Sequence, residues 1–314
     1  MTADSRNLEM DGLIIVDKPA GLTSHDVVLK IRKWLKIKKA GHTGTLDPMA
    51  TGVLIITLGQ ATRLFPYLSK MDKTYSGEIR LGQATDTYDA EGRPVGPLCD
   101  EYPSEDTLRL AMSEFEGEIS QLPPPYSAKK INGQPAFKLA REGKTPELKP
   151  VKVNVYRFML LDYQPPLVRF LVECSSGTYV RTLAHDLGQR VGCGAHLSQL
   201  RRLAVGTYTE QEAFSLDKIQ ELVASGHKEQ LLIPLDYLLP DYPAIYLDTQ
   251  GEKIFSHGQI IELDRVSRVT LGRRSAGKQF LYRVFSEKGR LLGLALFQPA
   301  GRIFQPELVF RQNP

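Results

Sequence analysis

The order of apolar and polar positions predicts both strands and helices near the amino terminus. Two mainly apolar runs, at residues 12–16 and 53–58, are typical of buried strands. Between them, apolar residues recur at helical spacing over residues 27–40, behind Thr23 or Ser24, either of which can cap a helix. Strands and helices are therefore expected to follow one another closely here.

The same patterns continue along the chain and divide it into two parts. Strand-like runs are predicted at 75–81, 151–161 and 168–174, and helix-like runs at 107–115 and before Gly192. A Pro-punctuated connection at 234–243 then leads to short β-like runs at 269–271, 280–285, 291–297 and 308–310. We expect a large body followed by a small β-rich unit.

One segment, residues 122–150, fits neither pattern. It is rich in Pro, Gly, Lys and Arg, which makes it too polar for a core and too long for a plain turn. We interpret it as a mobile flap.

The composition of the chain is that of a globular protein and argues against several other classes. The chain has 314 residues and 42% apolar residues, enough for one large domain and a small one. No apolar stretch reaches the roughly 18 residues that cross a bilayer, and the amino terminus lacks the order of a signal peptide, so a cytoplasmic protein is expected. Three scattered cysteines without a CxxC pair, and histidines without paired spacing, predict neither a disulfide framework nor a metal site.

Positive charge is concentrated in two places, although the net charge is only +4. Residues 27–40 hold six Lys or Arg and no acid, which predicts a helix with a cationic outer face that includes Lys30 and Lys33. Residues 245–314 hold 11 Lys or Arg against 6 Asp or Glu. Two basic surfaces of this kind suit a polyanion such as a nucleic acid, although Lys-rich faces often serve only to solvate a helix.

The strongest chemical signal is the run GHTGTLDPMATG at residues 41–52, which surrounds one carboxylate, Asp47, with three glycines. Such a loop holds an acid against a backbone that a substrate can approach closely. An isolated Asp before Pro more often only starts a turn. Here the segments found elsewhere along the chain favour chemistry.

Five segments in order resemble the TruB family of tRNA pseudouridine synthases: KPAGLTS at Lys18, the Asp47 run, KTY ending at Tyr75, SSGTYVRTLAHDLG around Arg181, and LRRLAVG from Leu200. The resemblance implies an α+β pseudouridine synthase fold, in which helices flank a large, mixed, mainly antiparallel sheet. It also implies a catalytic domain at 1–240 and a PUA-like RNA-binding domain at 245–314.

The resemblance further implies a reaction, the cofactor-free isomerisation of uridine 55 in the T loop of tRNA to pseudouridine. Asp47 would be the nucleophile, which suits a carboxylate because it can bond to the substrate and later leave. Arg181 would pair with Asp47 and hold it as an anion. Tyr75 would stack on the flipped uracil and serve in proton removal at C5. The residues leave open whether Asp47 attacks C6 of the base or C1′ of the ribose.

Further residues are implied around this centre. His42 resembles the histidine that packs where the uridine has left the loop, and Tyr179 and Leu200 would complete the pocket wall. Asp89 resembles an acid near the site that could compete with Asp47 for Arg181 when RNA is absent. Each residue also has a plainer interpretation, since His, Tyr and Leu most often serve as structural or core residues.

The partner implied is tRNA, bound by a monomer through its T arm and acceptor stem. Lys30 and Lys33, with Lys129 and Lys130 in the flap, would contact phosphates. Two other classes stay open. One is an RNA-binding or RNA-folding protein without turnover, although a pure binder does not need Asp47, Tyr75 and Arg181 together. The other is a hydrolase, which lacks the second carboxylate in a defined motif that a glycosidase would need.

Overall fold

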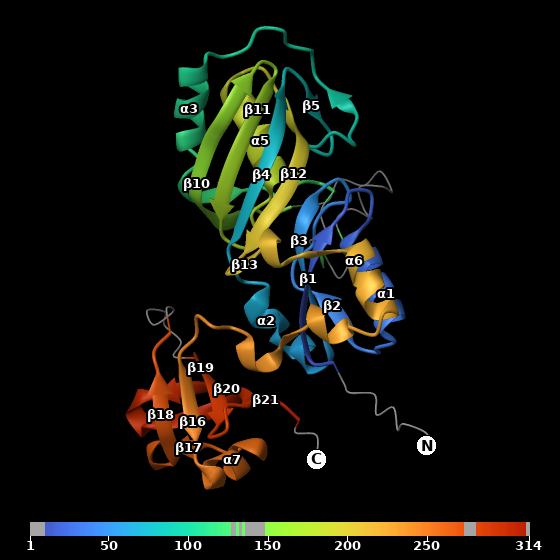
Figure 1. Cartoon of the computed structure of the whole chain (residues 1–314). Helices are drawn as coiled ribbons and strands as arrows, with labels where there is room; N and C mark the ends of the chain where they lie inside the picture. Colours follow the sequence, from blue (N-terminus) through green and yellow to red (C-terminus); the bar gives the residue numbers. More distant parts are fainter. Residues whose placement is uncertain (1–9, 127–129, 132–133, 136–147, 273–280, 312–314) are drawn as a thin grey trace.

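The computed structural model describes residues 10–126, 130–131, 134–135, 148–272 and 281–311. Within these ranges, the elements form a large body with an eleven-stranded sheet and a smaller unit with a six-stranded sheet (Figure 1). All strands of the first sheet lie before residue 235, and all strands of the second lie after residue 243. The division into domains 1–240 and 245–314 stays a prediction.

The large sheet has the order β14-β1-β3-β12-β4-β11-β10-β7, and off this path β13 pairs with β12, β15 with β1 and β2 with β3. Its strands are β1 (Gly12–Lys18), β2 (Ala40–His42), β3 (Thr51–Leu58), β4 (Lys73–Leu81), β7 (Gly117–Gln121), β10 (Val151–Gln164), β11 (Leu167–Cys174), β12 (Ala195–Val205), β13 (Tyr208–Thr209), β14 (Phe214–Ser215) and β15 (Ile233–Pro234). Most neighbours are antiparallel, whereas β12 runs parallel to β3 and β1 parallel to β14. The predicted α+β fold with a mixed, mainly antiparallel sheet is confirmed.

The helices of the body lie around this sheet. They are α1 (Ser24–Leu35), α2 (Phe65–Leu68), α3 (Glu105–Ser113), α5 (Val180–Arg190) and α6 (Leu216–Ala224), with the 3-10 turn η1 (Gly59–Leu64) before α2. A capping box between Thr23 and Asp26 starts α1, as expected for Thr23. The helix predicted at 27–40 ends earlier, because Lys36 adopts a left-handed conformation (φ 54°) and Ala40 already belongs to β2.

Short strand pairs and the small unit complete the described structure. The pairs are β5 (Ala84–Thr85) with β6 (Pro94–Val95), and β8 (Lys130–Ile131) with β9 (Gln134–Pro135). The small unit contains β16 (Ala244–Leu247), α7 (Thr249–Ser256), β17 (Ile261–Glu262), β18 (Val266–Thr270), β19 (Leu281–Ser286), β20 (Leu291–Gln298) and β21 (Ile303–Val309). Strand β12 and helices α6 and α7 were not predicted from the sequence pattern, and the last strand was expected at 308–310, although β21 begins at Ile303.

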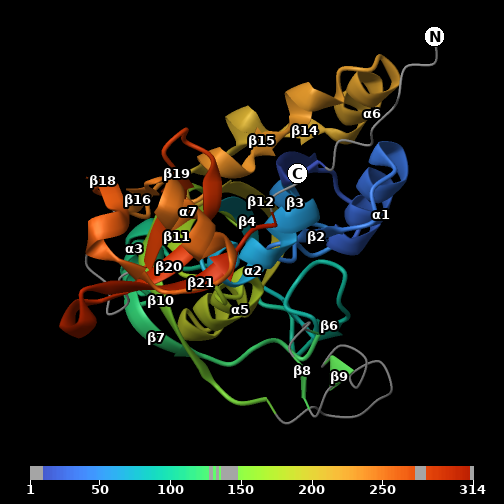
Figure 2. The same ribbon diagram turned by 90° about the horizontal axis from the view of Figure 1, so that it is seen from below.

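Strand β3 is apolar from Val53 to Ile56 because this stretch is buried on both faces. Leu54 and Ile56 face a core that α1, α3, α5 and α6 share. The alternating residues Val53 and Ile55 face a second core, to which the small unit contributes residues such as Leu294. The small unit lies below the body in Figure 1, and the view from below shows it over α2 (Figure 2). The strand that follows the Asp47 loop is thereby packed from two sides.

Candidate active site

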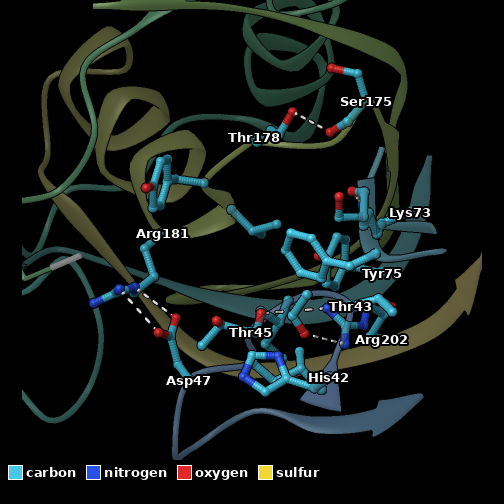
Figure 3. A pocket seen from close by; sticks show the side chains of 18 residues that line it. His42, Thr43, Thr45, Asp47, Lys73, Tyr75, Ser175, Thr178, Arg181 and Arg202 are labelled. Atoms are coloured by element: carbon cyan, nitrogen blue, oxygen red, sulfur yellow. Dashed lines mark hydrogen bonds and ion pairs between the residues drawn. The ribbon is translucent and has the colours of Figure 1, made fainter. Parts of the chain in front are cut away.

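A cavity of about 460 Å³ opens beside the loop that carries Asp47. Six of the residues singled out in the sequence line it: His42, Asp47, Tyr75, Tyr179, Arg181 and Leu200. They come from β2, the loop before β3, β4, the start of α5, and β12 (Figure 3). The sheet order β3-β12-β4 brings these segments together, since their strands are direct neighbours.

Hydrogen bonds on both sides of Asp47 fix its loop. Ser24, at the start of α1, accepts from the backbone N–H of Leu46 (2.8 Å) and donates to the Leu46 carbonyl (3.2 Å). The Nζ atom of Lys18 donates to the carbonyl of Pro48 (3.2 Å). The backbone N–H of Ala50 donates to the carbonyl of Asp47 (3.1 Å). The carboxylate is therefore presented by a backbone that neighbouring elements hold in place.

Arg181 lies between two carboxylates. Its Nε and Nη2 atoms contact Oδ2 and Oδ1 of Asp47 at 2.9 and 3.1 Å, a bidentate pair. Its Nη1 atom donates to Oδ2 of Asp89 at 3.0 Å. Arg181 thus binds both acids at once through different nitrogens, and a competition of the two acids for Arg181 stays a prediction. Burial raises the pKa of the Asp47 carboxyl, and Arg181 opposes that rise by stabilising the carboxylate.

Asp89 is the more enclosed of the two acids. Its side chain is 4% exposed, against 33% for that of Asp47. Thr87 Oγ1 donates to Oδ1 of Asp89 at 2.6 Å, and the backbone N–H of Glu91 donates to the same atom at 3.1 Å. Asp89 therefore has the bonding of a fixed support for Arg181, whereas Asp47 keeps an open side toward the cavity.

Tyr75 and Leu200 are both buried and lie on neighbouring strands at the cavity wall. Burial raises the pKa of the Tyr75 hydroxyl, while the nearby Arg202 acts to lower it. The phenol is therefore protonated at neutral pH. Tyr179 caps α5, where its backbone N–H donates to Gln121 Oε1 (2.7 Å).

His42 ends β2 at the cavity. Burial lowers its pKa, so the ring is neutral at pH 7, and its Nδ1 atom has no hydrogen-bond partner within the described residues. A neutral, mostly buried ring of this kind serves better as a packing surface than as an acid.

Three cationic residues in or beside the cavity wall were not predicted to take part in the site, although they belong to segments that resemble the family: Lys18, Lys73 and Arg202. Lys18 donates to the carbonyls of Pro19, Leu22 and Pro48. Lys73 donates to those of Ser69 and Met71. Burial lowers the pKa of each lysine to about 8. Their sequence signal was their place in the KPAG, KTY and LRR segments.

Two of the residues predicted to contact phosphates, Lys30 and Lys33, do not line the cavity. Lys30 and Lys33 are exposed on α1. Lys129 lies outside the described residues, as does the side chain of Lys130. In the parts of the chain that the structure describes, no cluster of His, Cys, Asp or Glu could hold a metal ion. No helix there is long and apolar enough to span a membrane.

Comparisons with known proteins give a consistent family. Residues 32–180 match the model of the TruB family pseudouridylate synthase N-terminal domain, and residues 181–240 match that of the tRNA pseudouridylate synthase B C-terminal domain. The tRNA pseudouridine synthase B of Aquifex aeolicus is 45% identical over 82% of this chain and 87% of its own length. That of Burkholderia pseudomallei is 41% identical over 91% of this chain and 93% of its own length.

Solved structures also match this chain over nearly its whole length. A chain from the structure of an H/ACA RNP bound to a substrate RNA containing 2′-deoxyuridine has a TM-score of 0.76 and 26% identity, and the match covers 97% of this chain and 86% of that chain. A chain of a Cbf5-Nop10-Gar1 complex has a TM-score of 0.74 and 26% identity, with 96% and 84% covered.

Proposed function

The chain belongs to the TruB family of pseudouridylate synthases, and from this premise we propose that it isomerises uridine 55 in the T loop of tRNA to pseudouridine. The observation that carries the proposal is the bidentate pair of Asp47 and Arg181 at a cavity walled by Tyr75 and Leu200. This arrangement supplies an oriented carboxylate beside a surface on which a base can stack.

The reaction needs no net gain or loss of atoms. The N1–C1′ bond of uridine breaks, a C5–C1′ bond forms, C5 loses a proton and N1 gains one. Asp47 acts as the nucleophile, either on C1′ of the ribose or on C6 of the base, and leaves again before the product is released. Arg181 orients the carboxylate and keeps it ionised against the effect of burial.

The target base must leave the RNA stack to reach Asp47. Tyr75 stacks on the flipped uracil, and Leu200 and Tyr179 close the pocket around it. The ring of His42 packs at the entrance, where its neutral form fits against RNA bases. Because the Tyr75 hydroxyl is protonated at rest, it takes up the C5 proton while passing its own proton to N1 of the uracil, the atom that gains one in the reaction.

Recognition of the rest of the tRNA is spread over the surface. Lys30 and Lys33 on α1 contact phosphates of the T arm, and the small unit contacts the acceptor stem. The protein acts as a monomer in the cytoplasm, where its tRNA substrate is found. Phosphate contacts of this kind release counterions, so affinity falls as salt rises.

The test is a turnover assay on an unmodified tRNA transcript, with reverse-transcription or mass mapping of the changed uridine. We expect conversion of one uridine, at position 55, and none in a transcript with cytidine at that position. Tight binding of the transcript without conversion of any uridine would instead support the RNA-folding alternative. Conversion at another position would refute the assigned target.

A further inference from the structure

Arg202 is one of the most deeply buried charged side chains among the described residues, with 2% of its surface exposed. It lies on β12 between the two strands that frame the cavity, in register with Tyr75 of β4 and Gly52 of β3. The guanidinium lines the same cavity as Asp47. Its position links the strand of the stacking tyrosine with the loop of the nucleophile.

The side chain of Arg202 binds the Asp47 loop at points before and after Asp47. Its Nη2 atom donates to the carbonyl of Gly44 at 3.1 Å, and its Nη1 atom contacts that of Thr45 at 3.5 Å. Its Nε atom donates to the carbonyl of Val53 at 2.7 Å. One planar group thus spans the loop and fixes its two ends relative to each other.

The backbone of Arg202 also lies in close contact with Gly52, at the end of the same loop. A Cβ atom added to Gly52 would lie 2.2 Å from the Arg202 carbonyl oxygen, and Gly52 has φ +98°, which other residues rarely adopt. A Cβ atom on Gly44 would lie 3.6 Å from Nη1 of Arg202, an ordinary contact. The glycine at the end of the GHTGTLDPMATG run is therefore required by contact with Arg202.

The charge of Arg202 is not matched by an acid. The hydrogen bonds of its guanidinium to Gly44, Thr45 and Val53 go to backbone carbonyls, and no salt bridge between Arg202 and a carboxylate is found within the described residues. Arg202 also acts to lower the pKa of Lys18, Lys73 and His42. A buried cation without an anionic partner destabilises a fold relative to an apolar side chain of similar size. Its retention here points to a role in the site.

We propose that Arg202 is a positioning residue that holds the Asp47 loop and the Tyr75 strand at a fixed spacing, so that the nucleophile and the stacked base meet in the reactive geometry. This inference rests on the proposed function. The planar guanidinium can donate to carbonyls at both ends of the loop at the same time, whereas a single ammonium group cannot reach both.

The test compares Arg202→Met and Arg202→Lys with wild type in single-turnover conversion at saturating tRNA, with tRNA affinity measured in parallel. We expect the rate to fall about 100-fold in the Met variant, the loss that misplacement by about 1 Å can cause. Affinity should change less than about threefold, because phosphate contacts supply most of it. In Arg202→Ala, added guanidinium ion at low concentration should restore part of the rate.

Arg201 provides the matched control. It is the preceding residue of β12, half-exposed, and pairs with Asp17 and Glu210 away from Asp47. Arg201→Met should convert tRNA at nearly the wild-type rate. A folded Arg202→Met variant with a normal rate would overturn the proposal. If the Arg202→Met variant does not fold, the Arg202→Lys variant is the deciding test. A normal single-turnover rate in Arg202→Lys overturns the proposal, whereas a slow rate in a folded variant that still binds tRNA supports it. No conversion by wild type would refute the proposed function instead.

A different observation concerns Phe65, whose side chain is 50% exposed where it lines the same cavity. It begins the single turn α2, which Leu68 anchors in the core shared with the small unit. The Phe65 ring is thus held on a rigid element at a site that takes an extruded base. Aromatic rings in such positions stack on bases of unpaired nucleotides.

We infer that Phe65 forms a second stacking subsite, for a nucleobase next to the flipped uridine. This too rests on the proposed function. The chain has one tryptophan, Trp34, so Trp34→Phe combined with Phe65→Trp yields a protein with a single indole at the subsite. Binding of tRNA should quench its fluorescence strongly. Phe65→Leu should weaken tRNA binding about tenfold, as loss of one base stack does.

Leu110 on α3, 66% exposed and far from α2 in Figure 1, provides the control. Leu110→Trp in the Trp34→Phe protein should show little quenching. The subsite is refuted if the wild-type protein modifies tRNA but Phe65→Leu binds it normally and the indole at position 65 is not quenched. Absence of conversion by the wild type would count against the proposed function and not against the subsite alone.

Discussion

Two buried arginines bind the Asp47 segment from different sides of one cavity, and they do so with different partners (Figure 3). Arg181 binds the carboxylates of Asp47 and Asp89. Arg202 binds backbone carbonyls of Gly44, Thr45 and Val53. The first arginine orients a reacting group directly, and the second orients the backbone that carries it.

The difference has an electrostatic consequence. The charge of Arg181 is neutralised by its acids, whereas Arg202 lies near Lys18 and Lys73, whose pKa values fall to about 8 because of burial and in part because of Arg202. The Arg202 side of the cavity is therefore positive. Positive potential in a concave site attracts RNA phosphates and favours negative charge that develops on a reacting base.

The largest effect is expected when the acid on the Arg181 side is changed. Asp47→Asn keeps the shape of the side chain but removes the nucleophile, so conversion of uridine should be lost while tRNA binding is nearly unchanged. Single-turnover conversion and binding are measured side by side. A rate within about tenfold of wild type, about 1.4 kcal/mol in barrier, would remove Asp47 from this role.

Asp89→Asn tests the supporting acid on the same side. The amide keeps a contact with Arg181 but not the charge, so Arg181 should be less firmly held and the rate should fall about tenfold, with tRNA affinity unchanged. The matched comparison is Asp86→Asn in the same loop, because Asp86 contacts the backbone of Arg93 and not Arg181. Equal rates for both variants would show that Asp89 does not support Arg181.

The two sides also differ in how far the sequence could predict them. Asp47 lies in a Gly- and Pro-rich loop, and Arg181 lies in a second motif, so local patterns and the family resemblance found both. Arg201 and Arg202 are adjacent on a strand, so their side chains point to opposite faces of the sheet. Which of them is buried depends on the pairing of β12 with β3 and β4, which lie far away in the sequence. No local pattern contains that pairing.

The same reason explains the successes and errors in the fold. The apolar runs that became β1 and β3 were recognisable because burial on both faces leaves few polar residues in them. Strand β12, in contrast, carries His196, Gln199, Arg201 and Arg202 among its apolar residues, so its pattern did not resemble a strand. Its polar side chains are accommodated by partners from other strands and loops, such as Asp17 and Val53.

Tyr75→Phe examines the residue that lies in register with Arg202. The ring still stacks, and only the hydroxyl is lost, so the rate should fall more than the affinity, by about tenfold or more. Tyr75→Leu should lower both, because stacking is lost as well. If the Phe variant converts tRNA as fast as wild type, the hydroxyl handles no proton and Tyr75 acts by stacking alone.

The smallest effect concerns the uncompensated charge on the Arg202 side and is measured as stability, with Lys73→Met as the variant. The folded pKa of Lys73, about 8, lies below the ordinary value of 10.5 because of burial first and Arg202 second.

Between pH 8 and pH 10.5 the unfolded chain binds more protons than the folded one. The stability of the wild type should therefore rise with pH relative to the variant, by at most about 1.4 kcal/mol per pH unit. Below pH 8, Lys73 is protonated in both the folded and the unfolded wild type, so the difference in stability between wild type and variant should no longer change with pH. Thermal or urea unfolding of both proteins at pH 7, 8, 9 and 10 measures it, and groups common to both, such as Lys18, cancel. A difference that stays constant from pH 7 to 10 would mean that Lys73 keeps its ordinary pKa, and that this side of the cavity is less positive than its buried cations indicate.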